Sequence, residues 1–99
     1  MKALSELKRI LEIHKDDIKE NFKVKEIGIF GSYLRGEMKE TSDLDILVEF
    51  ENDTSISLID FIKLENYLSE LLGVKVDLVD KESLRPTIGK TILREVVYI

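Results

Sequence analysis

The 99-residue sequence contains no cysteine, one proline and one histidine. The absence of cysteine excludes disulfide bonds and thiolate metal sites. No apolar run approaches the roughly 20 residues that a helix needs to span a bilayer, which argues against a membrane protein. Lysine and arginine never form a run longer than two residues and the formal net charge is -5, so the charge pattern disfavours a nucleic-acid partner.

The composition is that of a folded domain. Hydrophobic residues make up 43% of the chain and charged residues 35%, with acids and bases interspersed, which is typical of a solvated protein surface. A chain of this length suffices for one hydrophobic core, and we expect a single domain over residues 1–99. The first residues open a charged helical pattern rather than a signal peptide, so we expect a cytoplasmic protein.

Apolar periodicity predicts a mixture of helices and strands. Apolar residues at three-and-four spacing predict two amphipathic helices, at residues 4–18 and 58–72. Short β-branched or alternating segments predict three strands, at residues 24–30, 43–50 and 74–79. Residues 81–97, which include Pro86, are predicted to form a last helical segment, with or without a short strand at its end. The expected fold is α/β (α+β), a small mixed β-sheet with helices mainly on one face and an open face opposite.

Three aspartates are expected on that open face. Asp43 and Asp45 lie two apart on a predicted strand, so their Cα atoms are roughly 6 to 7 Å apart and their side chains leave the same face. Asp77 lies on a later strand, on the face opposite the aliphatic residues of that strand, and pairing of the two strands brings it beside them. Because its sequence neighbours are apolar, we expect a charge at Asp77 to be costly unless a partner is present. Two Mg²⁺ ions would relieve the repulsion and hold the reacting oxygens of a displacement at phosphorus. Structural alternatives stay open: a helix cap or an exposed strand edge for the pair, and a salt bridge from Asp77 to Lys75 or Arg35.

A Gly31-Ser32 turn follows the first predicted strand. Where a helix begins after such a turn, its backbone N–H groups are free to bind a triphosphate, and the Ser32 hydroxyl adds a donor. Arg35, one turn later, could reach the same phosphates or brace the aspartate pair. Alone, the turn is weak evidence, but ten residues separate Ser32 from Asp43, and the combined spacing is specific.

That spacing resembles the signature of the DNA polymerase beta-like nucleotidyltransferase superfamily. Within it, residues 31–36 (GSYLRG) and 42–48 (SDLDILV) resemble the minimal nucleotidyltransferases, the antitoxins of HEPN/MNT toxin–antitoxin modules. The resemblance covers nearly the whole chain and implies the polymerase beta-like fold. It further implies roles for the site residues: two metals held by Asp43 and Asp45, a second metal site completed by Asp77, and phosphates held by Gly31 and Ser32.

The resemblance also implies a reaction and a partner. The implied reaction is transfer of AMP from ATP to a tyrosine hydroxyl of a HEPN-type toxin, with release of pyrophosphate. About 20 residues after the last predicted strand are too few for an acceptor-binding domain, which fits an acceptor carried by a separate protein. Two alternatives stay open: transfer to a small-molecule hydroxyl such as that of an aminoglycoside, and a non-catalytic antitoxin that only binds its partner.

Two segments have no assigned role. The charged loop at residues 37–41 is either a solvated connection or a lid over the site. The apolar residues between Ile88 and Ile99 either pack on the sheet or face a partner.

Overall fold

The computed structural model describes residues 2–37, 39 and 41–99. The elements follow the chain in this order: α1 (Leu4–Phe22), β1 (Val24–Phe30), α2 (Ser32–Arg35), β2 (Leu44–Phe50), α3 (Leu58–Leu72), β3 (Val76–Asp80), the 3-10 helix η1 (Lys81–Ser83), α4 (Pro86–Glu95) and β4 (Val97–Tyr98). In this part of the chain the strands form one sheet in the order β3-β2-β1-β4. Strand β1 is antiparallel to β2 and to β4, whereas β2 and β3 are parallel, which confirms the expected mixed sheet.

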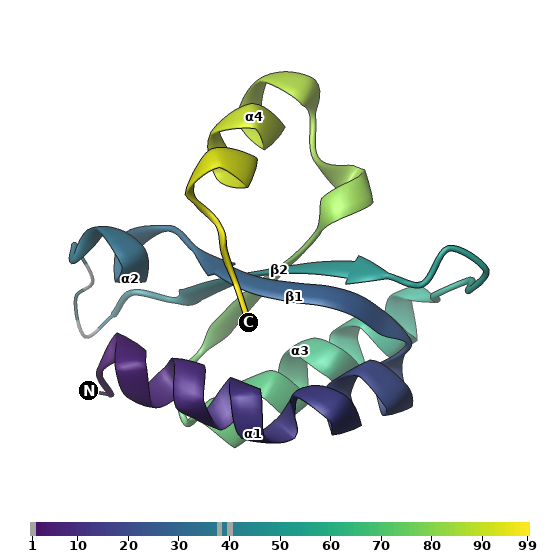
Figure 1. Cartoon of the computed structure of the whole chain (residues 1–99), viewed down its shortest axis with the longest axis horizontal. Helices are drawn as coiled ribbons and strands as arrows, with labels where there is room; N and C mark the ends of the chain where they lie inside the picture. Colours follow the sequence, from purple (N-terminus) through teal and green to yellow (C-terminus); the bar gives the residue numbers. More distant parts are fainter. Residues whose placement is uncertain (1, 38, 40) are drawn as a thin grey trace.

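Helices α1 and α3 cover one face of the sheet, and α4 projects from the other (Figure 1). The covered face holds the core, in which alternate residues of the central strands, such as Ile29 and Ile46, are fully buried beneath the helices. Each helix contributes a buried apolar stripe, Leu7, Leu11 and Ile18 from α1 and Leu64, Leu68 and Leu72 from α3. Burying one such side chain contributes about 1.5–3 kcal/mol. The expectation of helices mainly on one face is confirmed for the two long helices, but the sequence had not placed α4 on the open face.

Helix α3 and strand β3 are joined by side-chain hydrogen bonds that fix the edge of the sheet. The Val76 N–H donates to Ser69 Oγ at 3.0 Å, and the Leu78 N–H donates to Glu65 Oε2 at 3.0 Å. These amides point away from β2 and would otherwise be open to another strand. The same contacts hold β3 in the register that sets Asp77 opposite a residue of β2.

The ends of α3 follow the sequence signals. Ser57 and Asp60 form a reciprocal capping box at its N terminus, and Gly73 ends the helix with a φ of 69°. Among the helices that the structure describes, none combines the length and the apolar character needed to cross a membrane.

Candidate functional site

The carboxylates of Asp45 and Asp77 lie side by side on the face of the sheet opposite the core. The two residues are register partners in the parallel pairing of β2 with β3, where neighbouring strands lie about 4.8 Å apart. Both alternate with buried core residues, so both side chains point away from α1 and α3. Asp45 is half-buried and Asp77 is exposed.

Two details of the sequence-based picture change. Asp43 does not lie within a strand, because β2 begins at Leu44; it is half-buried immediately before the strand. Asp77 is not an acid forced into apolar surroundings, because strand alternation turns it to solvent while Val76 and Leu78 are buried. The electrostatic cost that we expected at Asp77 falls instead on Asp45.

The pKa of Asp45 is raised from 3.8 to about 6, and burial is the largest cause. The negative charges of Asp77 and Asp43 contribute to this rise, and Glu95 makes a smaller contribution in the same direction, whereas the positive charge of Arg35 opposes them. The charged form of Asp45 is therefore disfavoured, first by burial and then by its acidic neighbours. A cation bound beside Asp45 would favour the charged form.

The carboxylates do not form a finished metal site. Within residues 2–37, 39 and 41–99, no group of three acidic, histidine or cysteine side chains is arranged so that it could hold a metal ion. The expected convergence of three carboxylates on one preformed site is therefore not found in the described residues. The donor chemistry nevertheless fits Mg²⁺, which prefers hard oxygen ligands and is usually held by one or two carboxylates together with substrate phosphates. Asp45 and Asp77 supply such a pair.

The Gly31 turn lies directly against Asp45. Gly31 follows the last residue of β1, Phe30, which is the register partner of Asp45 across β1 and β2. Gly31 has a φ of 85°, and a Cβ added at this position would overlap the Asp45 carboxylate. Only glycine fits this backbone, both in conformation and in space. The predicted phosphate turn and a predicted metal ligand are thus brought into contact.

Helix α2 is a single turn after Gly31. Ser32 is its first residue and is half-buried, and Gly36 ends it with a φ of 69°. Of the loop that we considered as a lid, Met38 and Glu40 lie outside the described residues. The Ser42 hydroxyl accepts a hydrogen bond from the Lys39 N–H at 2.8 Å, so the end of the loop is tied down just before Asp43.

Arg35 is held by acids that the sequence had not connected with it. Its Nη1 donates to the Glu95 carboxylate at 3.1 and 3.2 Å, and its Nε lies 3.4 Å from Glu37 Oε1. The hydrogen bond with Glu95 is the main cause that raises the pKa of Arg35. Two roles were expected for Arg35. Contact with phosphates stays a prediction; toward the aspartate pair, its positive charge lowers the pKa of Asp45.

Glu95 is a site residue that sequence reasoning missed. Its Oε1 accepts a hydrogen bond from the Gly31 N–H at 3.0 Å as well as from Arg35. Glu95 is separated from Gly31 by 64 positions and has no motif around it. Only the return of the chain through α4 to pair β4 with β1 brings the two together.

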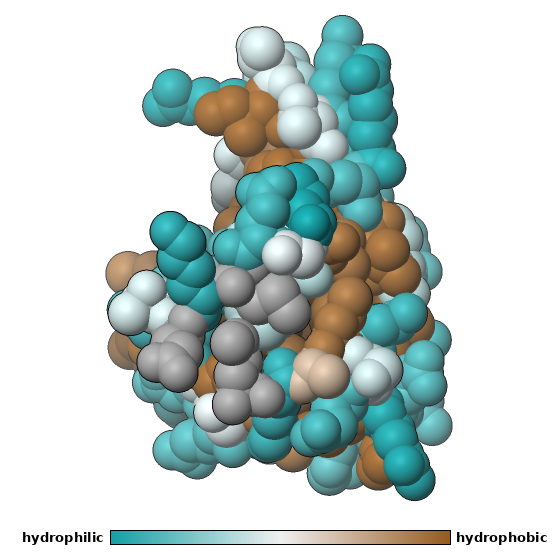
Figure 2. All heavy atoms as spheres, turned by 90° about the vertical axis from the view of Figure 1, so that its left-hand side faces the viewer, coloured by the Kyte–Doolittle hydropathy of each residue, from teal (hydrophilic) through white to brown (hydrophobic). Residues whose placement is uncertain are grey.

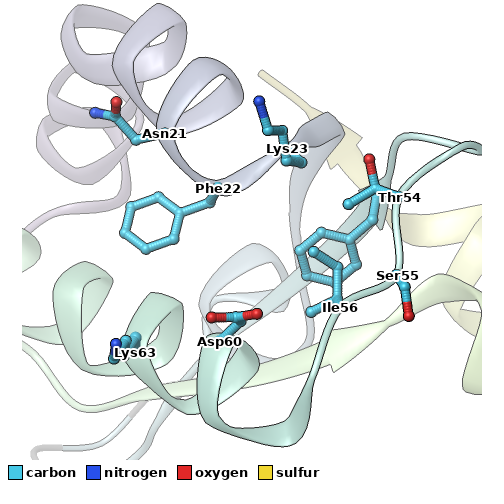
Figure 3. Close-up of a pocket in the computed structure, with 9 residues that line it drawn as sticks. Asn21, Phe22, Lys23, Thr54, Ser55, Ile56, Asp60 and Lys63 are labelled. Atoms are coloured by element: carbon cyan, nitrogen blue, oxygen red, sulfur yellow. The ribbon is translucent and has the colours of Figure 1, made fainter.

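Of the cavities in the described part of the chain, two differ in their position relative to the aspartates. One of about 600 Å³ adjoins the site and is lined by Tyr33, Thr41, Ser42, Asp43, Gly73, Val74 and Lys75. Another of about 430 Å³ lies at the far end of β2 and is lined by Phe50 together with Phe22, Lys23, Asp60 and Lys63. Figure 3 shows these last four side chains around the cavity. Phe50 is five residues along β2 from Asp45, or about 16 Å at the rise of a strand. The first cavity includes Asp43 in its lining, whereas Asp45 and Asp77 lie outside that lining.

Helix α4 carries exposed apolar side chains above the sheet. Figure 2 faces the α2 end of the molecule and shows α4 as a narrow projection with apolar surface on it. Ile88 is 59% exposed and Leu93 44% exposed, and in β4 Val97 and Tyr98 are also exposed. These residues therefore do not pack into the core of this chain, whereas Ile99 packs partly against it.

Comparisons with known proteins agree with this geometry. A family model described as a nucleotidyltransferase domain matches residues 11–99. The chain is 58% identical over 99 residues to the protein adenylyltransferase MntA of Thermococcus cleftensis, and the match covers 100% of this chain and 98% of the relative.

Solved structures share the fold. A toxin–antitoxin complex with AMP-PNP matches with a TM-score of 0.70 and 27% identity, over 93% of this chain and 70% of that chain. A tri-AMPylated Shewanella oneidensis HEPN toxin in complex with an MNT antitoxin matches with a TM-score of 0.62 and 25% identity, over 93% and 66% of the two chains. The fold is the expected polymerase beta-like one. The chain therefore belongs to the nucleotidyltransferase domain family, as a minimal nucleotidyltransferase related to the protein adenylyltransferases.

Proposed function

We propose that this enzyme transfers AMP from ATP, with Mg²⁺, to a tyrosine hydroxyl of a HEPN-type toxin and so acts as its antitoxin. The observation that carries the proposal is the contact of the Gly31 turn with Asp45, in register with Asp77. The name of the Thermococcus relative and the AMPylated toxin in the Shewanella complex support a protein acceptor. The AMP-PNP complex supports ATP as the donor, because AMP-PNP is an ATP analogue.

The aspartates and the Gly31 turn would have separate roles in this reaction. Asp43, Asp45 and Asp77 would hold the metal, which supplies charge neutralisation and polarises the phosphoryl oxygens when bound. The turn at Gly31 and Ser32 would orient the triphosphate with backbone and hydroxyl donors. The close approach of the turn to Asp45 would bring a triphosphate bound at the turn near the carboxylates.

The reaction exchanges one bond at phosphorus for another. The acceptor oxygen forms a bond to the α-phosphorus of ATP while the bond from the α-phosphorus to the bridging oxygen breaks, and pyrophosphate leaves with that bond's electron pair. Asp77 would take the proton of the incoming hydroxyl, a role that its exposed position supports. The exposure of Asp77 also leaves room for an acceptor carried on another protein.

Label transfer tests the proposal. The enzyme would be incubated with α-labelled ATP, Mg²⁺ and a purified HEPN toxin from the neighbouring gene, beside Asp45→Asn as the inactive variant. Asp53→Asn is the matched control, because Asp53 is exposed in the turn after β2. We expect label on the toxin with the wild type and with Asp53→Asn, and its loss with Asp45→Asn and with EDTA.

Other outcomes separate the alternatives. Pyrophosphate release only with a small alcohol would favour a small-molecule acceptor. Neutralisation of the toxin by Asp45→Asn as complete as by the wild type, without label, would favour occlusion by binding.

A further inference from the structure

Glu95 joins the C-terminal segment to the Gly31 turn. It is the last residue of α4, and one of its carboxylate oxygens accepts both from the Gly31 N–H and from Arg35 Nη1, at 3.0 and 3.2 Å. The second oxygen accepts from the same Nη1 at 3.1 Å. A single side chain thus fixes the first amide of the turn and the only arginine of α2.

The backbone around Glu95 is anchored on both sides. At the end of α4, the N–H of the next residue, Val96, donates to the Ile92 carbonyl at 2.9 Å, so this bond spans Glu95. After it, β4 pairs with β1, and the Ile99 N–H donates to the Ile27 carbonyl at 2.9 Å. Glu95 therefore does not lie on a free tail that swings into and out of the site.

Gly28 of β1 makes this anchoring possible. A Cβ at Gly28 would lie 2.7 Å from Val96 Cγ2 and 3.0 Å from the Val97 carbonyl oxygen. Without a side chain at this position, the backbone of β4 approaches β1 closely enough to pair with it. Because Val96 directly follows Glu95, this approach also sets where the Glu95 carboxylate stands.

The contact assigns the Gly31 amide to the protein rather than to the ligand. With this N–H bonded to Glu95, and with the Leu34 and Arg35 amides donating to the Gly31 carbonyl, the triphosphate is left with the Ser32 hydroxyl and the amides of Ser32 and Tyr33. Arg35 is likewise fixed by a carboxylate instead of extending freely into solvent. A hydrogen bond to a charged group is among the stronger ones in proteins, which suits a fixed arrangement.

We propose that Glu95 is a positioning residue of the nucleotide site, which holds the Gly31 turn and Arg35 in the arrangement that receives the triphosphate. This inference rests on the proposed function for the identity of the ligand. It differs from a competing role, in which Glu95 imitates a phosphate and leaves when ATP binds. The anchoring of Glu95 by α4 and β4 favours positioning over displacement.

Two measurements test the proposal on the full chain. The first needs no nucleotide: amide hydrogen exchange at Gly31 in the wild type, Glu95→Gln and Glu95→Ala. Loss of the acceptor in Glu95→Ala is expected to speed exchange at Gly31 by about tenfold or more, whereas Glu95→Gln keeps an acceptor oxygen and much of the protection. Equal exchange in all three proteins would overturn the contact itself.

The second measurement is binding and turnover with ATP and Mg²⁺. We expect KM for ATP to rise about tenfold in Glu95→Ala and about threefold in Glu95→Gln, with a smaller change in kcat, because the binding arrangement is lost rather than a reacting group. Glu70→Ala is the matched control, because Glu70 is an exposed acid on α3 and should leave both constants unchanged. An unchanged or lower KM in Glu95→Ala would overturn positioning, and a lower one would indicate displacement by the nucleotide.

The two measurements distinguish a failure of the proposed function from a failure of the role of Glu95. Absence of ATP binding by the wild type would overturn the proposed function, and with it the nucleotide role of Glu95. The exchange rate of Gly31 would still decide whether Glu95 fixes the turn.

Discussion

Replacement of Asp45 by asparagine should stabilise the metal-free protein while it abolishes the activity. The pKa of Asp45 is raised from 3.8 to about 6, chiefly by burial and then by Asp77 and Asp43. The folded protein therefore binds a proton at this carboxyl more tightly than the unfolded chain does. The stabilisation from that proton is complete below about pH 4 and is lost as the pH rises through about 6.

The size of the effect follows from the same values. A rise from 3.8 to about 6 corresponds to about 3 kcal/mol at about 1.4 kcal/mol for each unit of pKa. Asp45 is only half-buried, so solvent screening reduces this figure, and we expect Asp45→Asn to gain about 1–2 kcal/mol at pH 8. For a domain of this length, such a gain raises Tm by about 5–10 °C.

The assay is thermal and urea denaturation of the wild type and Asp45→Asn in EDTA, at pH 8 and at pH 4. The gain should be present at pH 8 and nearly absent at pH 4, where the folded wild type is protonated at Asp45. Asp53→Asn, in an exposed turn, should show no such gain. A less stable Asp45→Asn at pH 8, or a gain of equal size at both pH values, would refute the electrostatic reasoning.

Three further outcomes follow from the structure. Gly31→Ala should lose activity and about 1–3 kcal/mol of stability, because the backbone has a φ of 85° and the new Cβ overlaps Asp45. A variant with the turnover and the urea midpoint of the wild type would contradict this prediction. Leu68→Ala should lower the urea-derived stability by about 2–5 kcal/mol, because Leu68 is fully buried, and a loss under 1 kcal/mol would show a core able to collapse around the gap. ATP with Mg²⁺ should raise the Tm of the wild type by mass action. EDTA should cancel this rise, and Asp45→Asn should not show it. An equal rise of Tm in the presence of EDTA would argue against a metal at Asp45.

The parts of the site that the sequence predicted are local in the chain. Strand periodicity identified β2 and placed Asp45 on the face away from the aliphatic residues, and glycine before serine at the end of β1 identified the turn. The contact between Gly31 and Asp45 could not be predicted from either segment, because it depends on the antiparallel register of β1 with β2. Register is a property of the folded sheet rather than of one strand.

The parts that the sequence did not predict depend on distant segments. A charge at Asp77 was expected to be costly because its sequence neighbours are apolar, but alternation along β3 exposes this side chain. The electrostatic cost is found at Asp45, whose pKa is raised. Glu95 was not noticed, because an acid near the end of a helix is ordinary unless the fold brings a free amide to it. Helix α4 was predicted as a helical segment, but its position above the open face depends on how β4 pairs with β1.

The most direct measurement is the mass of the HEPN toxin after incubation with this enzyme, ATP and Mg²⁺. We expect the toxin to gain one or more adenylyl groups on tyrosine, and to gain none with Asp45→Asn. A toxin of unchanged mass beside an active, correctly folded enzyme would contradict adenylyl transfer to a protein hydroxyl.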